Sequence, residues 1–229
     1  MSKFSGFPPK LYQFLSELSD NNNKDWFEAN RERYELEVRE PALAYIAAMQ
    51  EPMAKISSQF QVEPKKMGGS LMRIHRDTRF SKDKSPYKTN VGIQFRHATG
   101  CDVHAPGFYI HLSPDENFFG VGTWHPAGNA LAAIRTAIQK NPKDWQKSAG
   151  DKAFRGRFDL AGDSLKRAPP GIDPEHPLID DLKRKDFISV QEFDPGLTTS
   201  QDFVKESVSA FKAARPFMKF LCDAIGVAF

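Results

Sequence analysis

The spacing of apolar residues changes along this chain, and the change constrains which folds the chain can adopt. Between Leu11 and Leu18 apolar side chains recur at positions i, i+3, i+4 and i+7, the repeat of an amphipathic helix. Similar repeats predict a second helix over residues 24–39 and a third that begins at Pro41, since proline is favoured in a first helical turn. The first quarter of the chain is therefore predicted to be helical.

In the middle of the chain apolar and polar residues alternate, which is the period-two pattern of a strand with one buried face. The predicted strands, including one late in the chain, are residues 71–76, 91–96, 108–112, 117–121 and 186–193. Strands of this kind usually form antiparallel sheets that pack one face on the core. The residues between the first two strands then form a long connection, and Pro86 argues against a continuous helix there.

The remaining segments are predicted to be helix and loop. A helix is expected over residues 129–140, whereas residues 150–177 are rich in Gly, Pro and Asp and are expected to cross the surface. Thr199 and Asp202 have the spacing of a capping box and predict the start of a long final helix. Pro216 is expected to kink that helix.

The complete pattern predicts an α+β protein with N-terminal helices, a central mostly antiparallel sheet and a long C-terminal helix. No repeat or linker divides the chain, so residues 1–229 are predicted to form a single domain. The two cysteines, Cys101 and Cys222, lie far apart, which excludes a disulfide framework and a thiolate zinc cluster. Because no apolar stretch approaches about 18 residues, the chain is predicted to be cytoplasmic and not bound to a membrane.

The segment of residues 73–88 carries nearly all of the net positive charge. It holds six Lys and Arg residues and two Asp residues, a local charge of +4, while the whole chain is +3. Arginine suits the bidentate recognition of carboxylate and phosphate, so the segment predicts a site for a small anionic ligand. The candidate ligand-binding residues are Arg73, Arg76, Asp77, Arg79, Lys84, Tyr87 and Lys88.

Two of these residues have alternative roles. Tyr87 lies between cations that could lower the pKa of its phenol for proton transfer, or its ring could pack beneath the loop. Asp77 could orient the arginines at a site, or Arg76, Asp77 and Arg79 could form an internal network by pairing with one another and with helix carboxylates. Clustered cations would also suit phosphoryl or acyl chemistry, since they stabilise charge that develops in a transition state.

A nucleic-acid-binding module is an alternative from a different class. The same cations would contact phosphates while Phe80 or Tyr87 stacks on a base. The sequence pI is near 8.8, whereas nucleic-acid-binding domains usually have a pI above about 9. The overall charge therefore favours binding of a small ligand over binding of nucleic acid. A structural or interaction protein is a further alternative.

Other motifs of known chemistry are absent from the sequence. No HExxH pair or P-loop occurs, and the stretch GVGTWHP lacks the third glycine of a dinucleotide-binding loop. Ser81 and Ser85 lack the GxSxG context of a nucleophile. His104, His111 and His125 could converge on a sheet face, but no metal site is predicted from them. The patterns identify no cofactor, substrate or oligomeric state.

The chain also resembles a bacterial and fungal family called domain of unknown function 2461. The resemblance rests on RIHRDTRFSKDKSPYKTN and extends to FLSELSDNNNKDWFEANRERYE, GFYIHLSP, GVGTWHP and LKRAPPGIDPEHPLIDDLKRKDF. It implies one full-length domain without an assigned activity. Relatives tend to have a run of glycines where this chain has Gly120, Val121 and Gly122, which argues against a role that needs a bare backbone at position 121.

Overall fold

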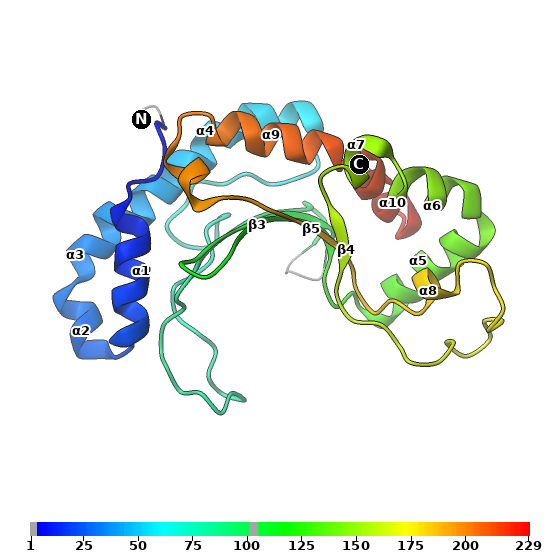
Figure 1. The fold of residues 1–229 in the computed structure, drawn as a ribbon, viewed down its shortest axis with the longest axis horizontal. Helices are drawn as coiled ribbons and strands as arrows, with labels where there is room; N and C mark the ends of the chain where they lie inside the picture. The colour runs from blue at the N-terminus through cyan, green and yellow to red at the C-terminus, as the bar shows by residue number, and fades with distance from the viewer. Residues whose placement is uncertain (1–3, 101–104) are drawn as a thin grey trace.

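The computed structural model describes residues 4–100 and 105–229, and its ribbon forms an arch around a curved sheet (Figure 1). Five strands of the described chain pair antiparallel in the order β1-β2-β3-β5-β4. They are β1 (Val91–Arg96), β2 (Gly107–Leu112), β3 (Asn117–Thr123), β4 (Asp159–Ala161) and β5 (Phe187–Glu192). The predicted antiparallel sheet is confirmed, and four of the five predicted strands lie within two residues of an observed one.

Helices precede and follow the sheet, which confirms the predicted α+β class. Those before it are α1 (Lys10–Asp20), α2 (Lys24–Ala29), α3 (Arg31–Arg33), the π-helix η1 (Tyr34–Arg39) and α4 (Glu40–Ile56). Those after the third strand are α5 (Gly128–Lys140), α6 (Pro142–Ala149), α7 (Lys152–Arg155), α8 (Ile179–Leu182), the 3₁₀ helix η2 (Pro195–Thr199), α9 (Phe203–Ala213) and α10 (Arg215–Ala224).

One face of the sheet is covered by α4, α9 and α10, which lie above it in Figure 1. Alternate residues of each strand point to these helices; Phe119 of β3 is fully buried, with its ring centroid 5.7 Å from that of Phe203 and 5.6 Å from that of Phe211. Tyr45 of α4 donates a buried hydrogen bond of 2.8 Å to Ser207 of α9. Most of the chain's phenylalanines are buried in this core, as expected for an aromatic side chain without a polar group.

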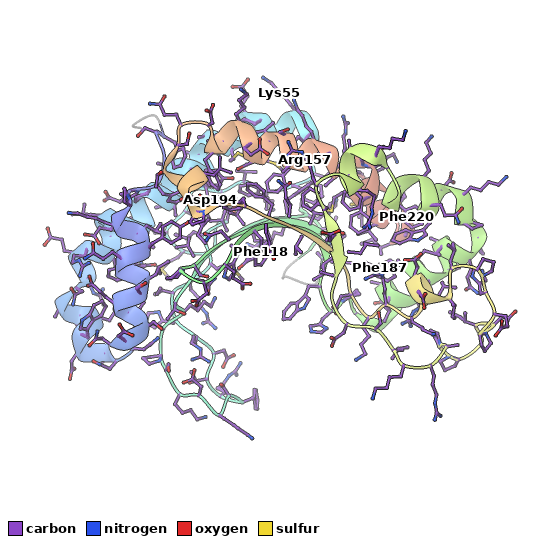
Figure 2. All side chains as sticks on the ribbon, in the orientation of Figure 1. Lys55, Phe118, Arg157, Phe187, Asp194 and Phe220 are labelled. Carbon is purple, nitrogen blue, oxygen red and sulfur yellow. The ribbon has the colours of Figure 1, made fainter. Side chains whose placement is uncertain are left out.

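Among the residues that the structure describes, no helix lies beneath the opposite face of the sheet. In Figure 1 this face lies between α1, α2 and α3 on one side and α5 and α8 on the other. The side chains of Figure 2 fill the layer between the sheet and the helices above it, whereas Phe118 lies on the uncovered side. Strand alternation therefore gives neighbouring residues of β3 opposite surroundings.

The strand predicted at residues 71–76 is not regular, and that prediction was wrong. Only isolated bridges form, between Leu71 and Ile93 and between His75 and Tyr87. The segment first lies against β1, where the Met72 N–H donates to Gly92, and then turns away. It next pairs with residues 86–88, a stretch that begins with a proline and so lacks one ladder donor. The change of partner interrupts the ladder.

The C-terminal helix is divided as Pro216 predicted. α9 ends at Ala213, and Pro216 lies in the first turn of α10. The predicted capping box is wrong, because the Asp202 side chain makes no cap hydrogen bond and its N–H donates to Ser200 Oγ. Among the described residues, no helix has both the length and the apolar character needed to cross a membrane.

Candidate functional site

The uncovered face of the sheet is hollowed into a pocket of about 360 Å³, which we call the sheet pocket. Its walls include the aromatic rings of Tyr109, Phe118 and Trp124. Its floor is formed where Gly107 and Gly120 place no side chain on this face. Because these two residues are glycines, the concave face of the sheet keeps a space that larger side chains would fill.

The two glycines of β3 serve different purposes. At Gly120 a Cβ atom would lie 3.5 Å from Tyr109 Cβ and 3.6 Å from a Phe118 ring carbon, an ordinary contact inside the pocket. At Gly122 φ is +118°, and a Cβ atom would lie 2.0 Å from the Phe187 carbonyl oxygen, so the backbone itself requires glycine. Val121 is buried on the helix side, so the pocket needs no bare backbone at position 121.

The pocket also contains a row of polar groups at its β2 end. Tyr109 Oη lies 3.2 Å from His111 Nδ1, and His111 Nε2 lies 3.6 Å from Glu116 Oε1. Burial raises the pKa of Tyr109 to about 12, although a hydrogen bond with Asn90 opposes the shift. Burial also lowers the pKa of His111, against the opposing charge of Glu116. At neutral pH these side chains therefore present a phenol and an uncharged imidazole to a ligand.

A second hollow of about 350 Å³, the polar recess, is lined by Asn22, Lys88 and Asn90 among others. Asn90 connects it to the sheet pocket, because its side chain bonds the Tyr109 hydroxyl. Burial lowers the pKa of Lys88, and the charge of Arg73 lowers it further, so the two cations are neighbours. Within the described part of the chain neither cation has a carboxylate partner at ion-pair distance. An anion in the recess would therefore meet the unpaired charge of Lys88, with Arg73 close by, while Asp83, which also lines the recess, is paired with Arg76.

The segment of residues 73–88, which we call the basic arm, projects below the sheet in Figure 1. Arg76 is paired with Asp83, and Arg79 Nη2 lies 2.7 Å from Asp77 Oδ2. The hydrogen bond from the Arg79 side chain, aided by the Arg79 N–H, lowers the pKa of Asp77 to about 2. These two pairs compensate two of the arm's six cations, and neither Arg76 nor Arg79 pairs with a helix carboxylate.

The predicted ligand-binding residues separate into two groups. Arg76, Tyr87 and Lys88 line the polar recess, with Arg73 close to Lys88. Asp77, Arg79 and Lys84 lie on the arm, where the Lys84 ammonium donates to the Thr78 carbonyl at 2.9 Å. The structure therefore brings together only part of the predicted set.

Tyr87 is a buried anchor of the arm. Its ring stacks on Phe27 at a centroid distance of 4.1 Å, and Asn22 bonds both its N–H and its carbonyl at 3.0 Å. Burial raises the pKa of its phenol, with Glu28 acting in the same direction, which is opposite to the shift expected from neighbouring cations. These contacts support the alternative in which the ring packs beneath the loop.

The histidines considered for a metal do not meet. His111 pairs with Phe118 at the start of β3, whereas His125 follows its end, and His104 lies outside the described residues. No group of three or more metal-ligating side chains occurs in the parts of the chain that the structure describes.

Comparison with known proteins places the chain in a family. A family model described as conserved hypothetical protein (DUF2461) matches residues 10–220. The chain belongs to the DUF2461 family. No curated protein and no solved structure matched it.

The sequence pattern alone missed much of the pocket of this DUF2461 chain. Tyr109, Phe118, Trp124 and the glycine floor were not predicted as site residues, and His111 was considered only as a metal ligand. A usable signal was present in the sequence, because Tyr109 and His111 alternate with the apolar Phe108, Ile110 and Leu112, and Gly120 follows Phe118 at the same two-residue spacing. Recognising it requires the strand register, which places Tyr109 opposite Gly120 and His111 opposite Phe118.

Proposed function

We propose that this DUF2461 chain binds a small molecule that has a flat, mostly apolar body and one anionic group. The observation that carries the proposal is the sheet pocket, whose glycine floor and aromatic walls leave a slot on an otherwise filled sheet. Its volume of about 360 Å³ falls within the range of small-molecule sites, about 300–1,000 Å³. Aromatic rings such as Tyr109 and Trp124 offer flat surfaces for stacking.

The anionic group is assigned to the polar recess. Lys88 is partly buried there, and a cation withdrawn from water gains more from an anionic partner than an exposed one does. Arg73 adds a second charge, and the Asn90 amide lies between the recess and the sheet pocket. A ligand that spans both hollows would place its ring on the sheet and its anion beside these residues.

Thermal unfolding in the presence of flat anions tests the proposal. The panel is benzoate, phenyl phosphate and nucleoside monophosphates, with benzamide as a neutral counterpart. A ligand at about 100 times its dissociation constant adds about 2.7 kcal/mol to the free energy of unfolding, so binding is visible as a raised Tm. We expect at least one anion of the panel to stabilise the chain, and benzamide to stabilise it less.

Two glycine variants make the test specific. Gly120→Val fills the pocket floor and should abolish the stabilisation, because its Cβ projects between Tyr109 and Phe118 without a clash. Gly128→Val is the matched control, since a Cβ atom at Gly128 meets nothing within 4 Å. Stabilisation by none of the anions, or equal stabilisation of wild type and Gly120→Val, contradicts the proposal.

Single-stranded nucleic acid is the second candidate ligand, and the tip of the basic arm, residues 77–85, favours it. Phe80 is 93% exposed, and the Arg79 guanidinium lies 5.7 Å from its ring centroid. An exposed ring among cations can stack on a base while the cations contact phosphates. Affinity for an oligonucleotide would then fall with salt at a slope of about −0.7 for each neutralised phosphate, and Phe80→Ala would weaken it. Submicromolar binding with a steep slope would favour this candidate over the small ligand.

A further inference from the structure

A buried carboxylate lies behind a histidine where β3 ends and the sheet pocket closes. The Asp186 side chain is 2% exposed, and its Oδ1 atom lies 3.2 Å from His125 Nδ1. Asp186 also accepts the His125 N–H at 2.7 Å and the Asp163 N–H at 2.9 Å. The two hydrogen bonds fix the position of the carboxylate, and the His125 Nδ1 atom lies within ion-pair distance of it.

The backbone at this position is unusual. Among the described residues, His125 is the only one other than glycine with a positive φ, which is 45°. Glycine and asparagine adopt this left-handed conformation more readily than histidine. The bond from the His125 N–H to Asp186 would form with any residue that has an N–H group. Holding the turn therefore does not explain why an imidazole stands there.

The imidazole lies next to a wall of the sheet pocket, although His125 is not itself one of the residues that line it. Its ring centroid is 4.3 Å from that of Trp124, whose side chain lines the pocket. The His125 side chain is 48% exposed, and Nδ1 is the atom that faces Asp186. Nε2 has no hydrogen-bond partner in the described part of the chain, so its lone pair is available to water or a ligand.

We propose that His125 is a general base that hydrolyses an aromatic carboxylic ester bound in the sheet pocket, with Asp186 as its positioning residue. The inference rests on the proposed function of that pocket as a site for flat, anionic molecules. Four residues separate Gly120 from Trp124 along the chain, a span of about 13 Å at strand spacing. The substrate is thus an ester whose ring and anionic group lie towards Lys88 and whose ester group reaches His125.

The reaction is a transfer of the acyl group to water. Nε2 accepts a proton from a water molecule as the water oxygen bonds to the ester carbonyl carbon. When the tetrahedral intermediate collapses, the bond from that carbon to the leaving oxygen breaks. Nε2 then returns the proton to the leaving oxygen, which gives an acid and an alcohol or phenol. Asp186 stabilises the protonated imidazole between these steps.

Hydrolysis of 4-acetoxybenzoate, an aromatic ester that carries one carboxylate, tests the proposal. The wild-type chain should hydrolyse this ester about 100-fold or more faster than the same concentration of free imidazole, the usual scale of general-base catalysis. His125→Asn should remove the enhancement while it keeps the turn, because asparagine tolerates a positive φ. His75→Asn is the matched control, since His75 is an exposed histidine of the basic arm, and it should retain the wild-type rate.

Two further variants separate catalysis from structure. Free imidazole should restore hydrolysis to His125→Gly, which opens space where the ring was and suits the positive φ. Asp186→Asn should lower kcat at least about tenfold with little change in KM, because it disturbs the orientation of His125 and not the walls of the pocket. A fall in KM and kcat together with loss of the folded state would indicate a purely structural carboxylate.

Failure of the general-base proposal can be distinguished from failure of the pocket to bind ligands. If the wild-type chain hydrolyses the ester no faster than imidazole, or if His125→Asn retains the rate, His125 is not a general base. Binding of phenyl phosphate by His125→Asn at wild-type affinity would then leave the pocket's proposed function intact. Absence of hydrolysis, together with stabilisation of the wild-type chain by none of the anions in the panel, would overturn both proposals.

Discussion

The sheet pocket and the basic arm present opposite combinations of shape and charge. The arm carries nearly all of the net positive charge of the sequence, yet it projects from the molecule, and Arg76 and Arg79 are paired with its own aspartates. The sheet pocket is lined mainly by apolar and aromatic residues and is a concave site. The difference teaches that a charge cluster in a sequence marks where cations are dense, not where they are unpaired. Near the polar recess, Arg73 and Lys88 have no carboxylate partner at ion-pair distance in the described residues.

The largest expected effect is on the free energy of unfolding, and it comes from substituting one of two adjacent phenylalanines on opposite faces of β3. Phe119→Ala removes a fully buried ring from the helix side and should lower the free energy of unfolding by about 3–5 kcal/mol. Phe118→Ala, on the pocket side, should cost much less stability but should weaken binding of flat anions. Denaturant unfolding and ligand titration of both variants measure the contrast. Equal destabilisation by the two changes would contradict the assignment of an uncovered face.

Variants of Tyr87 test whether the end of the arm nearest β1 is packed into the core. Tyr87→Ala should cost about 3 kcal/mol, because it removes a ring that stacks on Phe27. Tyr87→Phe should change the free energy of unfolding by less than about 0.5 kcal/mol, since no hydrogen bond of the hydroxyl to a described residue is observed. If Tyr87→Phe instead abolished ester hydrolysis with stability unchanged, a proton-transfer role for Tyr87 would replace His125 in the account.

The predictability of the fold and of the site differed for physical reasons. Strands β1, β2 and β3 could be predicted because one-sided burial imposes a two-residue repeat on local sequence, as at Ile93 and Phe95. The irregular pairing at residues 71–76 could not, because it depends on which partner the segment meets. The pocket likewise depends on register, which sets Gly120 opposite Tyr109. That the chain is a single domain stays a prediction.

The tip of the arm should contribute little to stability. Arg76→Ala and Arg79→Ala each remove an ion pair that is partly or largely exposed, and such pairs are screened by water and salt. Thermal unfolding should show a change in Tm of less than about 4 °C for either variant. A severe loss of folding in both would mean that the arm is a structural network and not an independent projection.

The smallest expected effect is a pH dependence of stability that arises from the Asp77–Arg79 pair of the arm. The pKa of Asp77 is about 2, below its ordinary 3.8, because Arg79 binds the charged carboxylate. The stabilising contribution is therefore present above about pH 4 and is lost as the pH falls through about 2. NMR titration of the Asp77 carboxyl carbon should give a midpoint near 2, and Arg79→Ala should raise it. A wild-type midpoint near 3.8 would show that the pair does not persist in solution.

Amide NMR of the chain titrated with phenyl phosphate tests the central claim most directly, because it reports the pocket and the arm in one experiment. The account predicts that shifts concentrate at Gly107, Gly120 and Gly122, with a change in the indole signal of Trp124, and that residues 77–85 change little. Shifts confined to residues 77–85, with the glycine amides of β2 and β3 unchanged, would contradict it and would move the binding site from the sheet pocket to the tip of the basic arm.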